Sequence, residues 1–346
     1  MTALLTVELL PLDKRVRAVR YHASPGESRI NLATGERMSV ADLLRALLLE
    51  SANDAAVTLA HAAGGSVHGF VGLMNARARQ LRLRQTSFAN PVGLDDPDNH
   101  SSARDLTVLA RVLLRHPFLA ETVDMARARL LSGSRARIVT NRNDLVRRFT
   151  WVDGVKTGHT GDAGYVLVGS AERKGVPLMS VVLGEPSLAA RDTDTVRLFN
   201  YGFSLYRRAK VVRAGATAAR AHVAYYGDRE ARLTPARSLV LTLRSGQRVH
   251  TVVDAPRELH GPLDRGERVG TVRVIQRGGR VERIALVTAE KVPGAGPLRK
   301  LVNWLVRPVV LLPLAAAAAV AALRRRRRMV AAEQARRRRR RAAQLE

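Results

Sequence analysis

Residues 151–164 read Trp-Val-Asp-Gly-Val-Lys-Thr-Gly-His-Thr-Gly-Asp-Ala-Gly, and the apolar run Tyr165–Val168 follows directly. This pattern predicts a β-strand that is entered through glycines and carries Lys156 and Thr157. Gly158 leaves room for another backbone to approach closely. On an edge strand, a lysine and a hydroxyl can hold an anion while the free backbone N–H groups pair with an extended peptide. The alternative interpretation is a solvated Lys-Thr-Gly at a strand end.

The composition is that of a globular protein with an unusually basic charge. Hydrophobic residues make up 46% of the 346 residues, which is enough for a sizeable core and excludes wholesale disorder. The absence of cysteine excludes a disulfide framework and a thiolate site. Lysines and arginines number 58 against 30 acidic residues, whereas aromatic residues are only 4%. Because single-stranded nucleic acids are bound by basic grooves with aromatic platforms, we expect this charge to attract anionic lipid or wall polymer, and no nucleic acid.

Helical and strand-like patterns divide the chain into an N-terminal body and a smaller C-terminal module. Ser39 predicts the start of one helix, and Ser51-Ala52-Asn53 stands between that helix and the next. For Ser51 and Asn53 the simplest interpretation is helix capping. Helices then give way to sheet-forming strands, an α+β pattern that we assign to residues 1–208. Short alternating runs predict a small all-β domain over 211–292, followed by a linker over 293–300.

An apolar segment near the C-terminus predicts attachment to a membrane. The only charged residue of Leu301–Leu323 is Arg307, and about 17–25 predominantly apolar residues suffice to span a bilayer. We therefore predict a transmembrane or membrane-anchoring helix over 301–323 and an Arg-rich tail over 324–346. A monotopic helix that lies in the interface is the alternative. Eleven arginines in the tail favour a cytoplasmic tail and an extracytoplasmic body at the cell membrane.

Two short motifs carry a resemblance to a known family. In this order, Ser51-Ala52-Asn53 and Lys156-Thr157-Gly158 resemble the last two of the three signatures of penicillin-binding proteins and serine β-lactamases. Further matching stretches are Phe70-Val-Gly-Leu-Met-Asn75, Ser101-Ser-Ala-Arg104-Asp105 and Val152-Asp-Gly-Val-Lys156-Thr-Gly158-His-Thr160. Over residues 1–206 the chain resembles the D-alanyl-D-alanine carboxypeptidases of the low-molecular-weight penicillin-binding proteins. The resemblance implies a penicillin-binding/serine β-lactamase-like domain, with a helical cluster and an antiparallel sheet.

The resemblance also implies an activity. It implies a serine-type D-Ala-D-Ala carboxypeptidase that acts on peptidoglycan stem peptides ending in D-Ala-D-Ala through an acyl-enzyme, without a cofactor. Among the catalytic residues, Ser51 would relay a proton and Asn53 would hold both the substrate amide and the catalytic lysine. Lys156 would raise the positive potential of the site. A β-lactamase is disfavoured by the predicted anchor and β module.

The substrate-binding residues implied by the resemblance lie on the central strand and one helix. Thr157 would anchor the peptide together with the strand N–H beyond it, and Gly158 and His159 belong to the same substrate-binding stretch with Lys156. Arg191 matches a family arginine that helps to fix the terminal carboxylate of the substrate. A surface arginine of a helix is the alternative for Arg191. We expect no metal site, since the nine histidines show no ligand spacing that converges with carboxylates.

The chain departs from the family at its first signature. The residues three positions before the six lysines are Pro11, Asp153, Ala171, Arg207, Thr288 and Pro297, so no Ser-x-x-Lys occurs. In the family this motif lies just before a helix that resembles Met1-Thr2-Ala3-Leu4. We therefore expect that the nucleophile segment is missing from the numbered chain and that β-lactams react only if it is restored. The alternative is an inactive membrane-tethered remnant that binds stem peptide or a partner.

Overall fold

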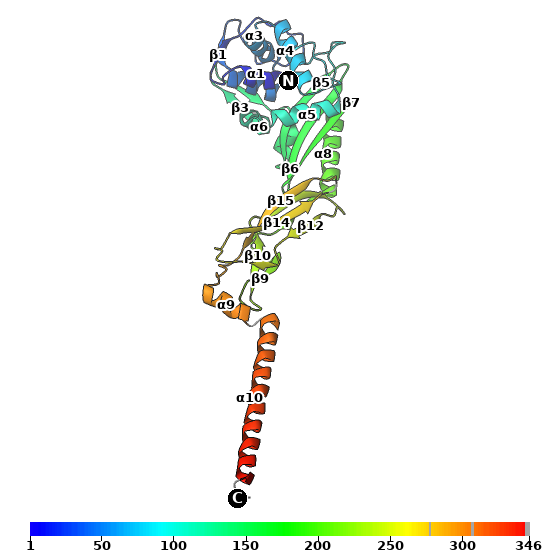
Figure 1. The fold of residues 1–346 in the computed structure, drawn as a ribbon. Coiled ribbons are helices and arrows are strands. Elements are labelled where there is room, and N and C mark those ends of the chain that lie inside the picture. Colours follow the sequence, from blue (N-terminus) through cyan, green and yellow to red (C-terminus); the bar gives the residue numbers. More distant parts are fainter. Residues whose placement is uncertain (277, 306–307, 343–346) are drawn as a thin grey trace. The chain divides into compact units, whose positions relative to one another are not determined.

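The computed structural model describes residues 1–276, 278–305 and 308–342 (Figure 1). The chain forms two compact units. One comprises Met1–Arg208 with Thr242–Ser245, and the other comprises Ala209–Leu241 with Gly246–Glu346. Each unit has a hydrophobic core of its own.

The first unit begins with a cluster of helices. They are α1 (Thr2–Leu9), α2 (Val40–Arg45), the π-helix η1 (Ala46–Glu50), α3 (Asn53–Gly64), α4 (Val67–Gln80), α5 (Ala103–Leu113) and α6 (Pro117–Asp124). As predicted, Ser39 caps α2, and its hydroxyl accepts a hydrogen bond from the Asp42 N–H at 3.2 Å. Leucines 43, 44, 49 and 59 project into the core and are fully buried. The helices therefore pack around one apolar centre, which fixes the position of the loop between η1 and α3.

A three-stranded antiparallel sheet follows the helices. Its strands are β5 (Val152–Thr160), β6 (Gly164–Arg173) and β7 (Val176–Glu185), in the order β5-β6-β7. The stretch predicted as one strand forms two: Lys156 and Thr157 lie on β5, at an edge of this sheet, whereas the apolar run Tyr165–Val168 belongs to β6. The long helix α8 (Leu188–Leu205) packs against β6 and β7, with Phe199 buried against Leu167 and Ala171. Two small antiparallel strand pairs and a short helix complete the body. The pairs are β1 (Arg15–Arg17) with β2 (Arg37–Ser39) and β3 (Arg127–Leu130) with β4 (Arg137–Thr140), and the helix is α7 (Asp144–Arg148).

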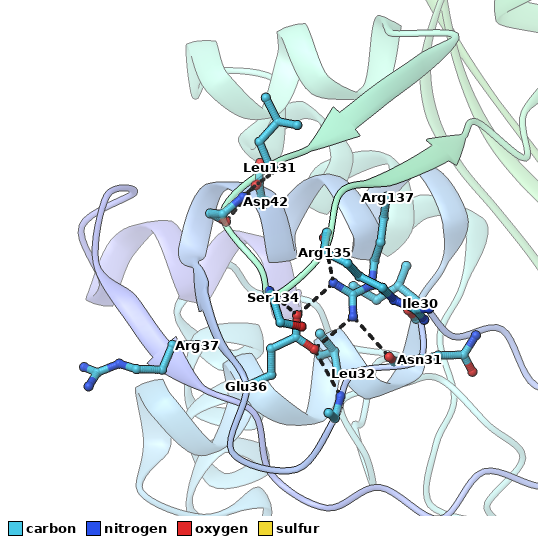
Figure 2. A network of polar contacts seen from close by, with 12 residues as sticks. Ile30, Asn31, Leu32, Glu36, Arg37, Asp42, Leu131, Ser134, Arg135 and Arg137 are labelled. Atoms are coloured by element: carbon cyan, nitrogen blue, oxygen red, sulfur yellow. Dashed lines mark hydrogen bonds and ion pairs between the residues drawn. The ribbon is translucent and has the colours of Figure 1, made fainter.

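A buried ion pair ties β4 to the loop before β2 (Figure 2). Arg137 donates to the two carboxylate oxygens of Glu36 at 2.8 and 2.9 Å. The Arg137 and Glu36 side chains are only 8% and 2% exposed. Backbone N–H groups of Ala33 and Ser134 donate to the same carboxylate. The Arg137 hydrogen bonds, with the backbone N–H groups, lower the pKa of Glu36 to about 2.

The second unit contains the predicted all-β module. Its six-stranded sheet has the order β12-β14-β15-β10-β9-β13. The strands are β9 (Ala219–Val223), β10 (Glu230–Pro235), β12 (His250–Asp254), β13 (Glu258–Leu259), β14 (Arg268–Ile275) and β15 (Val281–Thr288). Two further strands, β8 (Tyr206–Val212) and β11 (Leu239–Arg244), pair with each other. Leu233, Val274 and Leu286 are fully buried in the core of this module.

The C-terminal segment differs from the predicted membrane-spanning helix. It forms two helices, α9 (Pro297–Leu305) and α10 (Pro308–Ala342), while residues 306–307 of the predicted span and 343–346 of the tail lie outside the described residues. Within the described chain, no helix has both the length and the apolar character needed to cross a membrane.

Candidate active site

All the site residues predicted from the sequence line one cavity of the first unit. The cavity has a volume of about 1050 Å³ and lies between β5, the η1–α3 connection and the N-terminus of α8. Its lining includes Ser51, Asn53, Lys156, Thr157, Gly158, His159 and Arg191. The two motifs are about a hundred residues apart in the sequence, so the fold itself brings them together.

Lys156 lies on β5, opposite Val168 of β6. Its ammonium group donates a hydrogen bond to the carbonyl oxygen of Thr157 at 2.9 Å. Burial within the pocket, and then the positive charges of Arg142 and Arg191, lower the pKa of Lys156 to about 8, against an opposing contribution from Glu50. The group is therefore a cation at neutral pH that loses its charge just above it.

Ser51 adopts a left-handed backbone conformation, with φ 62° and ψ 37°, directly after η1. Arg142 holds the preceding residue, because its guanidinium donates to the Glu50 carbonyl at 2.8 Å and to the Glu50 carboxylate at 2.9 Å. No hydrogen bond joins Ser51 to Lys156 in the described part of the chain. The turn at Ser51 is sharp, and such conformations of non-glycine residues need support from their surroundings.

Neither Ser51 nor Asn53 caps the N-terminus of α3, whereas Ser51 is the C-cap residue of η1. The N-cap residue of α3 is Ala52, and no side chain caps this helix. Instead, the buried Asn53 side chain donates from Nδ2 to a carboxylate oxygen of Glu27 at 2.8 Å. Glu27 also lines the pocket, and nothing in its sequence context distinguished it, since it lies in a polar loop next to Pro25-Gly26.

Arg191 is buried, with 3% exposure, so it is not a surface residue of α8. Its Nε and Nη2 donate to the same oxygen of Asp192, at 3.0 and 2.7 Å. The other Asp192 oxygen lies 3.5 Å from Arg148. These contacts fix the plane of the guanidinium, and its remaining donors are available to the cavity that it lines.

The distal part of β5 forms one wall of the pocket. Gly158 is needed there, since a Cβ at this position would lie 2.8 Å from Val166 Cγ2. The close neighbour is thus a side chain of β6, and not another backbone as the sequence had suggested. The His159 ring stacks on Tyr165, with the ring centroids 3.9 Å apart. Among the described residues, no group of three or more histidine, aspartate or glutamate side chains could hold a metal ion.

This pocket combines an edge strand, a serine in a strained turn, a buried carboxamide, a buried arginine and a half-buried lysine. With the surrounding α+β fold, it defines a penicillin-binding or serine β-lactamase-like protein. The chain belongs to the D-alanyl-D-alanine carboxypeptidase family, whose profile matches residues 6–187. Members of this family are serine-type peptidases.

Individual relatives agree with this assignment. The chain is 30% identical to D-alanyl-D-alanine carboxypeptidase DacF of Bacillus subtilis, over 84% of this chain and 77% of that protein. It is 34% identical to D-alanyl-D-alanine carboxypeptidase DacA of Haemophilus influenzae, over 82% of this chain and 72% of the relative. Penicillin binding protein 5 from Haemophilus influenzae has a similar solved structure, with a TM-score of 0.58 and 29% identity over 85% of this chain and 89% of that one.

Proposed function

We propose that residues 1–208 form the substrate-binding part of a serine-type carboxypeptidase that removes the terminal D-Ala from peptidoglycan stem peptides. The observation that carries the proposal is the shared pocket of Ser51, Asn53, Lys156 and Arg191 beside the edge strand β5. The stem peptide pairs with the free edge of β5, and its terminal carboxylate faces Lys156, Thr157 and Arg191.

The reaction proceeds by acyl transfer. A serine oxygen attacks the carbonyl carbon between the two D-alanines, the C–N bond breaks, and the terminal D-Ala leaves as the amine. Ser51 relays the proton that this amine needs, and Asn53 holds the substrate amide. Backbone N–H groups of β5 stabilise the oxyanion. Water then attacks the acyl-enzyme, which releases the shortened peptide and restores the serine.

We further propose that a Ser-x-x-Lys ahead of Met1 supplies the nucleophile in a longer form of the protein. This proposal is supported by the absence of that motif from residues 1–346 and by the position of α1, whose first residues Met1, Thr2 and Ala3 line the pocket. A segment that preceded α1 would therefore adjoin the cavity.

Translation of the DNA upstream of the Met1 codon tests this proposal, followed by expression of both forms with a fluorescent β-lactam as the probe. The longer form should be labelled covalently and release D-Ala, whereas the 346-residue chain should do neither. Labelling of a serine within residues 1–346 would place the nucleophile in this chain. An upstream sequence without Ser-x-x-Lys would favour the second candidate, a membrane-tethered protein that binds stem peptide without cleaving it.

The pKa of Lys156 predicts how ligand binding depends on pH. The ammonium is present at pH 6–7 and is lost as the pH rises through about 8, so a carboxylate that it holds should bind progressively more weakly above this pH. Calorimetric titration of the 346-residue chain with N-acetyl-D-Ala-D-Ala between pH 6 and 9.5 measures this effect. The Lys156→Met variant should show weaker binding with a flat profile. A flat pH profile in the unaltered chain would show that Lys156 does not hold the ligand carboxylate.

For the second unit we propose attachment to an anionic membrane surface through α9, with the body on the extracytoplasmic side. Arg299 of α9 stacks its guanidinium 3.7 Å from the Tyr226 ring centroid and donates to the Tyr225 carbonyl at 3.1 Å. The cationic side of the helix therefore faces the β module. The apolar residues Leu298, Leu301, Val302 and Trp304 are 52–73% exposed. Exposed leucines and an indole beside an Arg-rich segment suit the bilayer interface.

The membrane proposal predicts that two acidic substitutions on the exposed apolar side of α9 strongly weaken binding to vesicles. Leu301→Glu with Trp304→Glu should lower binding to vesicles of phosphatidylglycerol and phosphatidylcholine at least about tenfold, because burial of two apolar side chains is lost. Leu131→Glu is the matched control, since Leu131 is 65% exposed on the first unit. Equal sedimentation of both variants with vesicles would contradict the proposal.

Protease digestion of spheroplasts that carry a tag after Glu346 then decides the side of the tail, since an interfacial helix leaves the tag cleavable and a span protects it.

A further inference from the structure

The loop that carries Tyr21 and Glu27 forms a wall of the pocket beside Asn53. Its residues Pro25, Gly26, Glu27 and Ser28 all line the cavity. The Glu27 side chain is half-buried and accepts three hydrogen bonds. The donors are the Tyr21 hydroxyl, the Ser24 N–H at 2.8 Å and the Asn53 Nδ2 at 2.8 Å.

The bond to Asn53 decides the orientation of its carboxamide. A carboxamide presents a donor edge and an acceptor edge of nearly the same shape, so only its partners determine which edge lies on which side. An ionised carboxylate can only accept hydrogen bonds, so Glu27 requires the Nδ2 edge of Asn53 on its side. The hydrogen bonds from Tyr21 and Asn53 hold the pKa of Glu27 below its usual range, which keeps this carboxylate ionised at neutral pH.

The loop does not depend on this bond for its attachment to α3. The Asn53 backbone N–H donates to the Ser28 carbonyl at 2.8 Å. The Asp54 carboxylate accepts from the Ile30 and Leu32 N–H groups at 3.1 and 2.9 Å. Because these bonds already join the two segments, the contact between Glu27 and the Asn53 side chain is free to serve the orientation of the amide.

We propose that Glu27 is a positioning residue, which holds the Asn53 carboxamide in a single orientation. In this orientation the second N–H and the oxygen of the amide always face the same groups of the substrate. The inference rests on the proposed function of the pocket and adds a residue that neither sequence motif contains. Glu27 itself does not touch the reacting atoms.

A double-mutant cycle on the 346-residue chain tests this role, with N-acetyl-D-Ala-D-Ala as the probe. Glu27→Met keeps the length of the side chain but removes the acceptor, and we expect it to weaken peptide binding about tenfold, the effect of losing one well-placed hydrogen bond. The same substitution in an Asn53→Ala background should have no further effect, because Glu27 acts only through Asn53. Glu121→Met is the matched control, since Glu121 is exposed on α6 and does not line the cavity, and it should leave the affinity unchanged.

The side-chain amide resonances of Asn53 give a readout independent of any ligand. In ¹⁵N-labelled protein, one Nδ2 proton should be shifted downfield and protected from exchange, and it should stay so on acidification until Glu27 takes up a proton. Both features should vanish in Glu27→Met and return partly in Glu27→Gln, whose amide oxygen can still accept. Additive effects in the cycle, or an Asn53 amide signal that is the same in Glu27→Met, would overturn the positioning role. If no variant binds the peptide while the amide signature behaves as described, the proposed function fails and the positioning of Asn53 stands.

Discussion

Replacement of Lys156 by alanine should lower kcat/KM for a D-Ala-D-Ala peptide at least about 10²-fold in a form of the protein that carries the nucleophile. Lys156 lies on the edge strand β5, where we propose that the peptide binds, and the buried Arg191 provides a second cation in the pocket. Loss of the ammonium removes charge that acts on the substrate carboxylate in a partly desolvated site. Release of D-Ala under steady-state conditions measures the effect.

Arginine should not replace this lysine. A planar guanidinium is larger than an ammonium group and carries its donors in a different geometry. Lys156→Arg should therefore remain at least about tenfold below the unaltered enzyme, a difference comparable to one misplaced charge-assisted hydrogen bond. Lys291→Ala serves as the control, since Lys291 is 74% exposed on the second unit and should be silent. Full activity of Lys156→Ala would show that Lys156 has no role in the reaction.

The largest effect on stability should come from Arg137→Met. This substitution removes the partner of Glu36 and leaves a carboxylate with only 2% exposure without its cation (Figure 2). Breaking a buried ion pair in this way costs about 3–5 kcal/mol of unfolding free energy. Arg197→Met is the matched control. It removes an ion pair to Asp194 from a side chain that is 77% exposed, and should cost less than about 1 kcal/mol.

Urea denaturation of both variants measures the two free energies at pH 7. The double variant Glu36→Leu with Arg137→Met should recover much of the lost stability, because it leaves no buried charge unpaired. The folded-state pKa of Glu36 is depressed from 4.5 to about 2. The stabilisation by this carboxylate is therefore complete above about pH 4.5 and is lost as the pH falls toward 2. Equal costs for Arg137→Met and Arg197→Met would contradict the account of this pair.

The residues whose chemistry follows a sequence motif could be found from the sequence. Lys156 and Thr157 stand in a pattern typical of a strand, and the structure shows that strand as β5, with Gly154 and Gly158 inside it. Ser51 and Asn53 could be found only together with the later motif, since each residue type also suits a helix cap. Their place in the pocket depends on tertiary packing that no local pattern contains.

Other parts of the site depend on contacts between distant segments. Glu27 lies 26 positions before Asn53, and no spacing rule connects a carboxylate in a polar loop to an amide at a helix start. Likewise, the burial of Arg191 follows from how α8 packs on the sheet, whereas its sequence context is that of an exposed helix. For the apolar segment near the C-terminus, the sequence predicted a transmembrane or membrane-anchoring helix, and no helix among the described residues is long and apolar enough to cross a membrane.

The most direct test of the central claim is a titration of the ¹³C-methyl-labelled 346-residue chain with N-acetyl-D-Ala-D-Ala and, separately, with its C-terminal amide. The methyl groups of Thr157 and Val166 line the pocket and report binding there without any catalysis. We predict that the free carboxylate shifts these resonances and that the amide binds at least about tenfold more weakly, since it lacks the charge that Lys156 and Arg191 recognise. Equal affinity of the two peptides, or shifts confined to methyl groups outside this pocket, would contradict the assignment of the substrate site.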